Sequence, residues 1–333
     1  MSTGESAAAR PQRAFTPHVE DFRGDFARLS AMMIEAWSRR KEQALVYSEP
    51  YLRSCFAFPG MSSGLAPAIY DGDDPVAFIA GFPRRFKVHG RELNAVRASM
   101  LTTSASLNAA GWGIIVWSAL ARRARALGFE AMVNYAVAGL GVDAFFLGCG
   151  RRLELTTTHV FTARCLASLL RPGNDGPPHG GEADPRLFAA EANALAARTP
   201  IARVWSEAEA EWEIRSRYGA VAVQHTFGGR TGLVAGYVMQ LAGAGAPKCV
   251  LVENVLWGGL EGTERQELLR GFLARAQRAG AGMAIVPCLN SFDTAPFREA
   301  GFRLSRRIID IFISVWPGAA SIQPAESIAT DVF

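Results

Sequence analysis

The chain has 333 residues, of which 49% are hydrophobic and 10% aromatic, and its formal net charge is +4. This length exceeds one typical domain and suits two domains of about 150 residues, each able to bury a core. The small positive charge argues against a nucleic-acid surface but permits an anionic ligand, and we expect the scattered arginines to lie on solvated faces. No apolar run reaches the length of a membrane span, so we expect no membrane partner.

The cysteines are dispersed and show neither a C-x-x-C pair nor the spacing of metal ligands; they are Cys55, Cys149, Cys165, Cys249 and Cys288. Such a set predicts reduced, buried thiols in a cytoplasmic protein, and no metal site. Residues 1–18 contain Ala, Ser and Arg without an apolar core. We expect them to form a disordered tail, not a signal peptide.

The first part of the chain alternates helical and strand patterns. Apolar spacing near 3.6 predicts helices at 22–40 and 50–58, followed by strands at 66–70, 76–82 and 95–103. A glycine-bearing turn then opens a helix that ends near 127, and a strand at 130–137, a short helix at 142–149 and a strand at 155–163 complete the series.

A second series repeats this order after residues 171–185, which contain neither apolar periodicity nor strand formers and are predicted to be a linker. Helices are expected at 185–197 and 205–217, and strands at 220–226, 231–241 and 249–257. A helix at 263–279, a strand at 283–287, a short helix at 294–300 and a strand at 308–315 follow. One structural plan is therefore used twice, with little identity between the copies.

The most informative segment is the turn that joins the strand at 95–103 to the following helix. Gly111 and Gly113 stand at the helix start, where free backbone N–H groups and the helix dipole can hold a phosphate. Without a Cβ, glycine lets such a ligand approach the backbone closely. A purely structural strand-to-helix turn is the alternative, because such turns use glycine anyway.

The sequence Asn108-Ala109-Ala110-Gly111-Trp112-Gly113 resembles the Arg/Gln-x-x-Gly-x-Gly/Ala turn that holds the pyrophosphate of coenzyme A in the GNAT superfamily of acyl-CoA N-acyltransferases. Asn108 stands where that family usually has Arg or Gln. The order of elements in both copies also resembles the GNAT fold. The acetyltransferase of mycothiol synthesis and the N-myristoyltransferases share this tandem architecture in outline, and no residue match chooses between them.

The resemblance implies an α/β fold of two tandem GNAT-like domains, each a mixed, mostly antiparallel sheet flanked by helices. The CoA-binding domain would span 19–170 and a second domain with a degenerate CoA motif 186–320, joined by the linker at 171–185 and followed by a C-terminal tail at 321–333. The implied cofactor-binding residues are Leu101, Thr102, Thr103, Asn108, Ala109, Ala110, Gly111, Trp112, Gly113 and Asn134.

The second copy lacks the features of a diphosphate site. Thr263 and Arg265 replace the two glycines, and Glu261 and Glu264 would repel a diphosphate. Thr263 is expected to cap the helix, with Gln266 in the capping-box position. We therefore assign CoA to the first copy and a structural or acceptor-binding role to the second, with the opposite assignment left open.

The general acid of the family is missing from both copies. The resemblance implies a tyrosine that protonates the leaving thiolate, but Phe146 and Phe297 stand at that position. Tyr135, next to Asn134, could supply a hydroxyl instead, although such a tyrosine is more often part of the core. Backbone N–H groups at 101–103 are expected to polarise the thioester carbonyl.

Glu253 is the candidate general base, because it is a carboxylate in the middle of an otherwise apolar strand. Burial would raise its pKa towards a useful value. The alternatives are an exposed edge position or a buried partner for an arginine. Its place in the second copy requires the two domains to share one cleft.

Together these features predict a cytoplasmic acyl-CoA-dependent N-acyltransferase that moves an acyl group, first of all from acetyl-CoA, directly to a small-molecule amine bound between the domains. It would use no metal and bind no nucleic acid. A non-catalytic acyl-CoA-binding or regulatory protein stays open, as does altered chemistry such as decarboxylation or transfer of a longer acyl chain. The sequence does not specify the acceptor or the oligomeric state.

Overall fold

The structure of the chain is a computed structural model that describes residues 18–38, 44–105, 111–139, 142–170, 180–243, 245–319 and 321–332. Asn108, Ala109 and Ala110 of the predicted CoA turn lie outside the described residues, as do 1–17 of the predicted tail and 171–179 of the predicted linker. We refer to 18–170 as the first half and to 180–332 as the second half.

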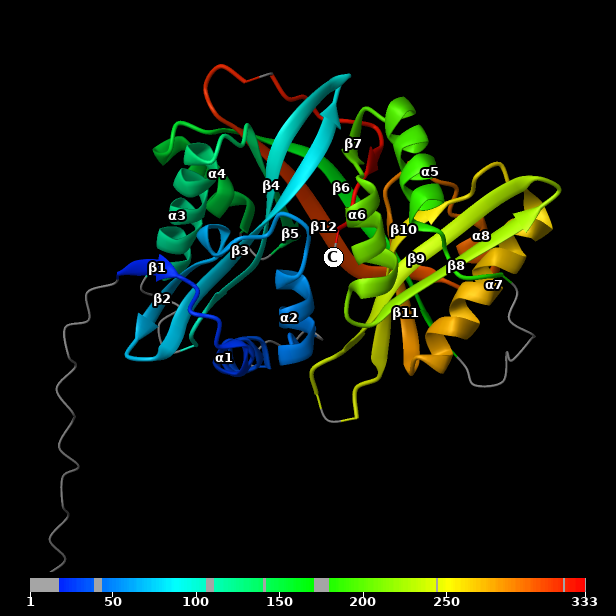
Figure 1. Cartoon of the computed structure of the whole chain (residues 1–333), viewed down its shortest axis with the longest axis horizontal. Coiled ribbons are helices and arrows are strands. Elements are labelled where there is room, and N and C mark those ends of the chain that lie inside the picture. The colour runs from blue at the N-terminus through cyan, green and yellow to red at the C-terminus, as the bar shows by residue number, and fades with distance from the viewer. Residues whose placement is uncertain are drawn as a thin grey trace, which may run out of the picture.

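One mixed sheet runs through both halves (Figure 1). In the first half its strands are β1 (Val19–Asp21), β2 (Pro67–Asp71), β3 (Asp74–Val88), β4 (Arg91–Thr103), β5 (Ala131–Val137) and β6 (Thr156–Leu169). In the second half they are β7 (Ile201–Val204), β8 (Ala220–Phe227), β9 (Arg230–Gln240), β10 (Lys248–Leu256), β11 (Ala281–Cys288), β12 (Arg303–Val315) and β13 (Ile328–Ala329). The strand order is β1-β2-β3-β4-β5-β12-β6-β11-β10-β9-β8, and β7 pairs with β3 and β13.

Helices cover both faces of this sheet. The first half contributes α1 (Phe26–Ser38), α2 (Glu49–Phe56), α3 (Trp112–Ala126) and α4 (Val142–Arg152). The second half contributes α5 (Pro185–Arg198), α6 (Glu207–Glu211), α7 (Gly262–Arg278) and α8 (Ala295–Glu299). A mixed α/β fold with the same order of elements in each half is thus confirmed.

The apolar side chains divide into separate cores on the two faces. In the first half, α1 and α2 pack on one face through Leu29 and Leu52, while α3 packs on the other through Trp117 and Leu120. The second half repeats this arrangement, with α5 and α6 on one face and α7 on the other. The core under α1 and α2 continues across β9 to β12, so it joins the two halves.

The last strands of the two halves are exchanged. Strand β12 of the second half pairs with β5 of the first, from Ile309 opposite Val137 to Val315 opposite Ala131. Strand β6 of the first half pairs with β11 of the second, from Met283 opposite Leu169 to Cys288 opposite Arg164. Strands β6 and β12 also pair with each other, so the sheet is continuous across the middle of the molecule.

Several element boundaries differ from the prediction. The predicted helix at 22–40 begins only at Phe26, because Gly24 adopts a φ of 88°, outside the helical region. The predicted helix at 205–217 is α6, capped by Ser206, and continues as a π-helical turn over Trp212–Ser216. The short strands β1, β7 and β13 were not predicted, because two to four residues carry no periodic signal.

The cysteines fit the expectation of unpaired thiols. All five lie among the described residues and none forms a disulfide. Cys55, Cys149, Cys165 and Cys249 are buried, and Cys288 is partly buried. Among the helices that the structure describes, none is long and apolar enough to cross a membrane.

A glycine on β9 fixes how closely β9 and β10 approach. Gly236 lies opposite Val252, and a Cβ built on it would stand 2.1 Å from the backbone oxygen of Leu251. We predict that Gly236→Ala lowers the free energy of unfolding by at least about 2 kcal/mol, because the strands must separate to admit the methyl group. Urea denaturation followed by circular dichroism measures the change.

The matched control is Gly148→Ala in α4, where a Cβ has no described neighbour within 4 Å. Helix propensity predicts a small gain there, up to about 1 kcal/mol. Equal effects of the two substitutions would contradict the close approach at Gly236.

Candidate active site

The predicted CoA turn lies where two parallel strands separate. Strands β4 and β5 pair only from Ala95 opposite Ala131 to Ala98 opposite Asn134. Directly after this stretch β4 bulges away from β3, and Met100 in the bulge has a φ of 62°. Beyond Ala98 the backbone of β4 no longer pairs with β5, so its N–H groups on that side face the gap that opens between the strands.

Helix α3 begins at the mouth of this gap. Gly111 precedes it with a φ of 73°, a conformation that favours glycine, and no side chain that the structure describes caps the helix. A Cβ on Gly113 would lie 3.7 Å from Thr103 Cγ2 and 3.9 Å from Leu101 Cδ1, so the helix start packs closely on the end of β4. Ile114 N and Ile115 N both donate to Gly111 O, at 3.0 and 3.4 Å, and the positive end of the helix dipole favours an anion at this helix start.

The corresponding helix start in the second half is closed by carboxylates. Glu261 caps α7, and its side chain and that of Glu264 form a reciprocal capping box. The prediction of Thr263 as cap with Gln266 was wrong, because the helix begins two residues earlier, where a glutamate can reach the free N–H groups. Arg230 Nη2 lies 2.6 Å from Glu264 Oε1 and neutralises that charge. The two carboxylates at this helix start would repel a diphosphate.

Strand β10, which precedes α7, has the same two features as β4: its parallel pairing ends early, and it contains a bulge. Strand β10 pairs in parallel with β11 only from Lys248 to Leu251, and it bulges against β9 between Val252 and Asn254. The residue in the bulge is Glu253, so the predicted base occupies the place in the second half that Met100 occupies in the first.

The C-terminal segment fills the gap between β10 and β11. Ile328 N donates to Leu289 O at 3.0 Å, and β13 pairs in parallel with β7. Val332 N donates to Glu253 Oε2 at 2.7 Å. Residues 321–332 had been predicted as part of a C-terminal tail, but Ile328, Asp331 and Val332 are buried in the interior.

Asp331 is fully buried among three arginines from different strands. Its Oδ2 lies 2.7 Å from Arg97 Nη1 on β4, 3.0 Å from Arg84 Nη2 on β3 and 3.0 Å from Arg203 Nη1 on β7. Burial alone would raise the pKa of this carboxyl, but the three guanidinium groups outweigh burial and hold its pKa well below its usual range. Asp331 is therefore ionised at any ordinary pH.

These arginines are the functional residues that sequence reasoning missed, because we expected arginines to be solvated. Arg84, Arg97 and Arg203 are all at least nine-tenths buried. The sequence did contain a sign of their burial, because these arginines stand in apolar strand patterns such as Ala95-Val96-Arg97-Ala98 and Ile201-Ala202-Arg203-Val204. An arginine on the inward face of a strand implies a buried anion, but the sequence alone did not identify Asp331 as that anion.

Glu253 is buried next to arginines, which carry the opposite charge, and next to other carboxylates, which carry the same charge. Its Oε1 lies 3.7 Å from Arg217 Nη1, and Arg217 also pairs with Glu213 at 2.9 Å. Burial raises the pKa of Glu253, Arg217 lowers it and Glu213 raises it again, which places the pKa at about 7. Of the interpretations weighed for this residue, the exposed edge position is wrong, the buried partner of an arginine is confirmed, and the role of general base stays a prediction.

Tyr135 reaches the same C-terminal segment from the first half. Its hydroxyl lies 2.8 Å from Thr330 Oγ1, and the Arg97 guanidinium lies 5.2 Å from its ring centre. Burial raises the pKa of this phenol, so it stays protonated and can donate a proton. The structure thus brings Tyr135 and Glu253, from different halves, to the same three residues, 330–332.

Three other predicted or aligned residues have side chains in the core. Phe146 and Phe297 are buried, packed on Trp117 and Trp257 respectively, and offer no polar group. Asn134 is fully buried and its Oδ1 accepts a hydrogen bond from Trp117 Nε1 at 3.0 Å. Only Oδ1 of Asn134 is used in this way, since its Nδ2 has no hydrogen-bond partner in the described part of the chain, and its role in cofactor binding stays a prediction.

Side chains of other elements cover part of the end of β4. Thr102 is buried and its Oγ1 accepts a hydrogen bond from Trp37 Nε1 at 3.0 Å, while Leu101 and Thr103 are partly exposed. Trp112 is buried at the start of α3. Among the described residues, no group of three or more His, Cys, Asp or Glu side chains could hold a metal ion.

Removing the buried negative charge tests the arginine cluster. We predict that Asp331→Asn lowers the free energy of unfolding by about 3–5 kcal/mol, because Arg84, Arg97 and Arg203 would lose their shared anion. Urea denaturation measures the loss. The control Glu326→Gln, at an exposed position of the same segment, should change the free energy of unfolding by less than about 0.5 kcal/mol. An equally small change in Asp331→Asn would refute the stabilising role of the cluster.

The raised pKa of Glu253 predicts a pH dependence of stability. Between its ordinary value of 4.5 and about 7 the folded chain holds a proton that the unfolded chain has lost, so this group makes stability fall as pH rises. The groups facing it are Arg217, Glu213, Arg97 and Asp331. Glu253→Gln should therefore become more stable relative to the parent from pH 5 to pH 7, by at most about 1.4 kcal/mol per pH unit. Parallel stability curves in this range would exclude the shift.

Comparisons with known proteins show a similarity of structure only. No protein-family model and no curated protein matches the sequence. A crystal structure of Saccharomyces cerevisiae N-myristoyltransferase with bound myristoyl-CoA aligns with a TM-score of 0.72 and 11% identity, over 92% of this chain and 84% of that chain. Another, with myristoyl-CoA and inhibitors, aligns with a TM-score of 0.74 and 11% identity, over 96% and 83%.

A GCN5-related N-acetyltransferase from Kribbella flavida aligns with a TM-score of 0.49 and 15% identity, over 90% of this chain and 71% of that chain, a similarity too weak to support any inference. The likeness to N-myristoyltransferase spans nearly the whole described chain and both of its halves. The chain therefore has the fold of N-myristoyltransferase, with the elements of both halves in the same arrangement.

Proposed function

We propose that this protein is an acyl-CoA-dependent N-acyltransferase that binds one acyl-CoA in its first half. The observation that carries the proposal is the gap between β4 and β5, with its bulge at Met100 and, at Gly111, the start of α3, which no described side chain caps. The likeness to a protein solved with myristoyl-CoA supports this assignment. The division into domains at 19–170 and 186–320 is part of the same proposal.

The backbone would make most of the cofactor contacts. The first-turn N–H groups at Gly111, Trp112 and Gly113 would hold the pyrophosphate, as anions favour a helix N-terminus. Backbone N–H groups at 101–103 would polarise the thioester carbonyl. The second half offers no equivalent site, since Glu261 caps α7 and residues 328–332 fill the gap between β10 and β11.

In the proposed reaction the acceptor nitrogen forms a bond to the thioester carbonyl carbon, and the carbon–sulfur bond then breaks. The amine must lose a proton, and Glu253 is the proposed base because its pKa lies near neutrality. The thiolate must gain a proton, and Tyr135 is the proposed acid because burial keeps its phenol protonated. The buried Phe146 and Phe297 cannot serve as that acid.

The proposal also concerns the identity of the acyl group and of the acceptor. Acetyl-CoA is the donor that we test first, and the likeness to N-myristoyltransferase makes a long-chain acyl-CoA the second donor to test. The acceptor is proposed to be a small-molecule amine. Location in the cytoplasm is a prediction from the cysteine pattern.

Calorimetric titration of the full chain with acetyl-CoA and myristoyl-CoA tests cofactor binding. We expect one site per chain and its loss in the double variant Gly111→Asp/Gly113→Asp, because two carboxylates would repel the pyrophosphate at the start of α3. The matched control is Thr263→Asp at the start of α7, which should bind acyl-CoA as the parent does. Binding that survives in the first variant and is lost in the control would move the cofactor to the second half. No binding of either thioester by the folded parent would overturn the proposal.

The role of Tyr135 is tested by Tyr135→Phe. We expect kcat to fall about tenfold or more while the dissociation constant for acyl-CoA stays unchanged, because only the proton donor is lost. Stopped-flow measurement of thiol release with an accepted amine gives kcat. An unchanged kcat would assign Tyr135 to structure alone, through its hydrogen bond to Thr330.

A further inference from the structure

A π-helical turn follows α6 and brings two charged residues into the interior of the second half. It spans Trp212–Ser216, and Arg217 N donates to Trp212 O at 2.7 Å, a bond that spans five residues where an α-helix spans four. Such turns are rare and lie frequently at functional sites. Glu213 and Arg217 are only 1% and 4% exposed, so the turn places a carboxylate and a guanidinium inside the protein.

The first half holds this turn in place. Trp212 Nε1 donates to Ser54 O of α2 at 2.9 Å, and Tyr218 N donates to Ser54 Oγ at 3.1 Å. The Trp212 ring packs edge-on against Phe58, with 5.0 Å between the ring centres. These contacts lie on both sides of the two charged residues in the sequence, so the packing of the two halves fixes where the charges stand.

Glu213 and Arg217 form a buried ion pair. Arg217 Nη1 donates to Glu213 Oε1 at 2.9 Å and to Oε2 at 3.2 Å. The guanidinium carbon lies 3.3 Å from the ring centre of Tyr237 on β9, whereas Arg217 Nε has no hydrogen-bond partner in the part of the chain that the structure describes. The cost of removing two charges from water offsets most of their attraction, so such a pair adds little net stability. Its burial next to a third ionisable group indicates a role in the site.

The third group is Glu253, which Arg217 approaches without a hydrogen bond. Arg217 Nη1 lies 3.7 Å from Glu253 Oε1, beyond hydrogen-bond distance, because the same nitrogen is held by Glu213. An arginine bonded directly to Glu253 would keep that carboxyl ionised and lower its pKa. Glu213 opposes this effect, since its negative charge raises the pKa of Glu253. Glu253 therefore stands beside a pair whose charges nearly cancel, and burial decides its protonation.

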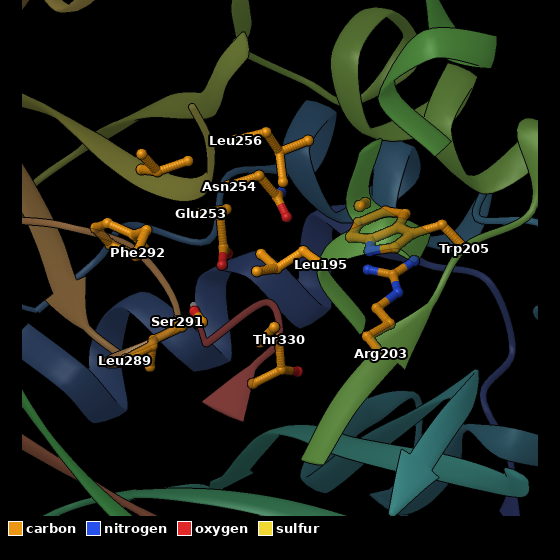
Figure 2. A pocket seen from close by; sticks show the side chains of 13 residues that line it. Leu195, Arg203, Trp205, Glu253, Asn254, Leu256, Leu289, Ser291, Phe292 and Thr330 are labelled. Carbon is orange, nitrogen blue, oxygen red and sulfur yellow. The ribbon is translucent and has the colours of Figure 1, made fainter. Parts of the chain in front are cut away.

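Glu253 is oriented toward the C-terminal segment. Its side chain extends from β10 toward this segment (Figure 2), where Val332 N donates to Oε2 at 2.7 Å. Besides the ion pair, the charged and titratable groups around it are Arg97 on β4, Tyr135 on β5, Arg203 on β7, Tyr237 on β9 and Asp331 next to Val332. All of these are unchanged in the variants used below, so a shift in the pKa of Glu253 comes from the pair alone.

We propose that Glu213 and Arg217 are positioning residues for the general base. Glu213 holds the guanidinium of Arg217 beside Glu253 but out of hydrogen-bond distance, so that a carboxylate oxygen of Glu253 takes the proton that the acceptor nitrogen loses. The ion pair itself gains and loses no proton. The proposal rests on the proposed function, in which Glu253 is that base, and adds the two residues that keep Glu253 from becoming the fixed partner of an arginine.

Urea denaturation measures the pKa of Glu253 without acyl-CoA. The four chains are the parent, Glu253→Gln, Glu213→Gln and the double variant, each unfolded between about pH 5 and pH 8. The stability that Glu253→Gln gains over its background should rise with pH up to about 7 in the parent, and stop rising at least about one pH unit lower in Glu213→Gln. Without the Glu213 charge, Arg217 can bind Glu253 directly and lower its pKa. An unchanged endpoint in folded Glu213→Gln would overturn the proposal.

Two further variants control for charge and for folding. Glu211 pairs with Arg215 at 3.0 Å with the same spacing of four residues, but both side chains are nearly half exposed, so Glu211→Gln should leave the endpoint unchanged. An equal shift there would overturn the proposal. Glu213→Gln/Arg217→Gln leaves neither charge unpaired and should move the endpoint back to about pH 7 or above. An endpoint below that of the parent would contradict the role of Arg217, even if Glu213→Gln alone does not fold.

The pH profile of kcat/KM tests the catalytic consequence, with the acyl-CoA and the amine that the parent accepts. The acidic limb should move to lower pH in Glu213→Gln by the same interval as the stability endpoint, while the KM for acyl-CoA stays unchanged. A purely structural ion pair would lower kcat/KM equally at every pH. A shifted endpoint with an unshifted profile would overturn the proposal, because Glu253 would then not be the base. The proposed function is judged separately, by the calorimetric titration with acyl-CoA.

Discussion

The ionised carboxylate of Asp331 is the interaction on which the centre of the molecule depends. It joins β3, β4 and β7 through Arg84, Arg97 and Arg203, and it stands at the end of the segment that closes the second half. Buried charges are tolerated only when each is paired and further contacts hold the partners in place. Arg84 lies 3.8 Å from the ring centre of Phe58, so aromatic rings share in holding the cluster. This carboxylate lies between Thr330, which contacts the Tyr135 hydroxyl, and Val332, whose N–H donates to Glu253.

The two halves follow one plan but differ in what occupies the gap between the parallel strands. In the first half the bulge of β4 is followed by the start of α3, which no described side chain caps. In the second half the bulge of β10 carries Glu253, the helix start is capped by Glu261, and the chain's own residues 328–332 fill most of the gap. The two halves thus share one plan, and in the second the chain's own C-terminal residues occupy the space at the separated strands.

The sequence allowed the repeated plan to be predicted, because helices such as α3 and α7 and strands such as β9 and β10 are long enough to show their period. The glycine turn and Glu253 were also visible, since a glycine pair at a helix start and a carboxylate in an apolar strand are local signals. The arginine cluster was not, because Asp331 lies more than one hundred residues from each of its partners and only the fold brings them together. Strand β13 and the bulge at Glu253 depend in the same way on distant pairing, which no local pattern encodes.

The exchange of β6 and β12 has a consequence for how the chain reaches its native state. Strand β5 pairs with β4 on one side, but it cannot acquire its second neighbour until β12 has been made, and the paired residues Val137 and Ile309 are separated by most of the second half. Contacts between such distant segments form slowly, because a long loop must close before they stabilise anything. During synthesis the first half must wait with an open sheet edge, which is the kind of surface that pairs wrongly with other chains. The tandem is therefore one cooperative unit, and its two halves acquire their stability together.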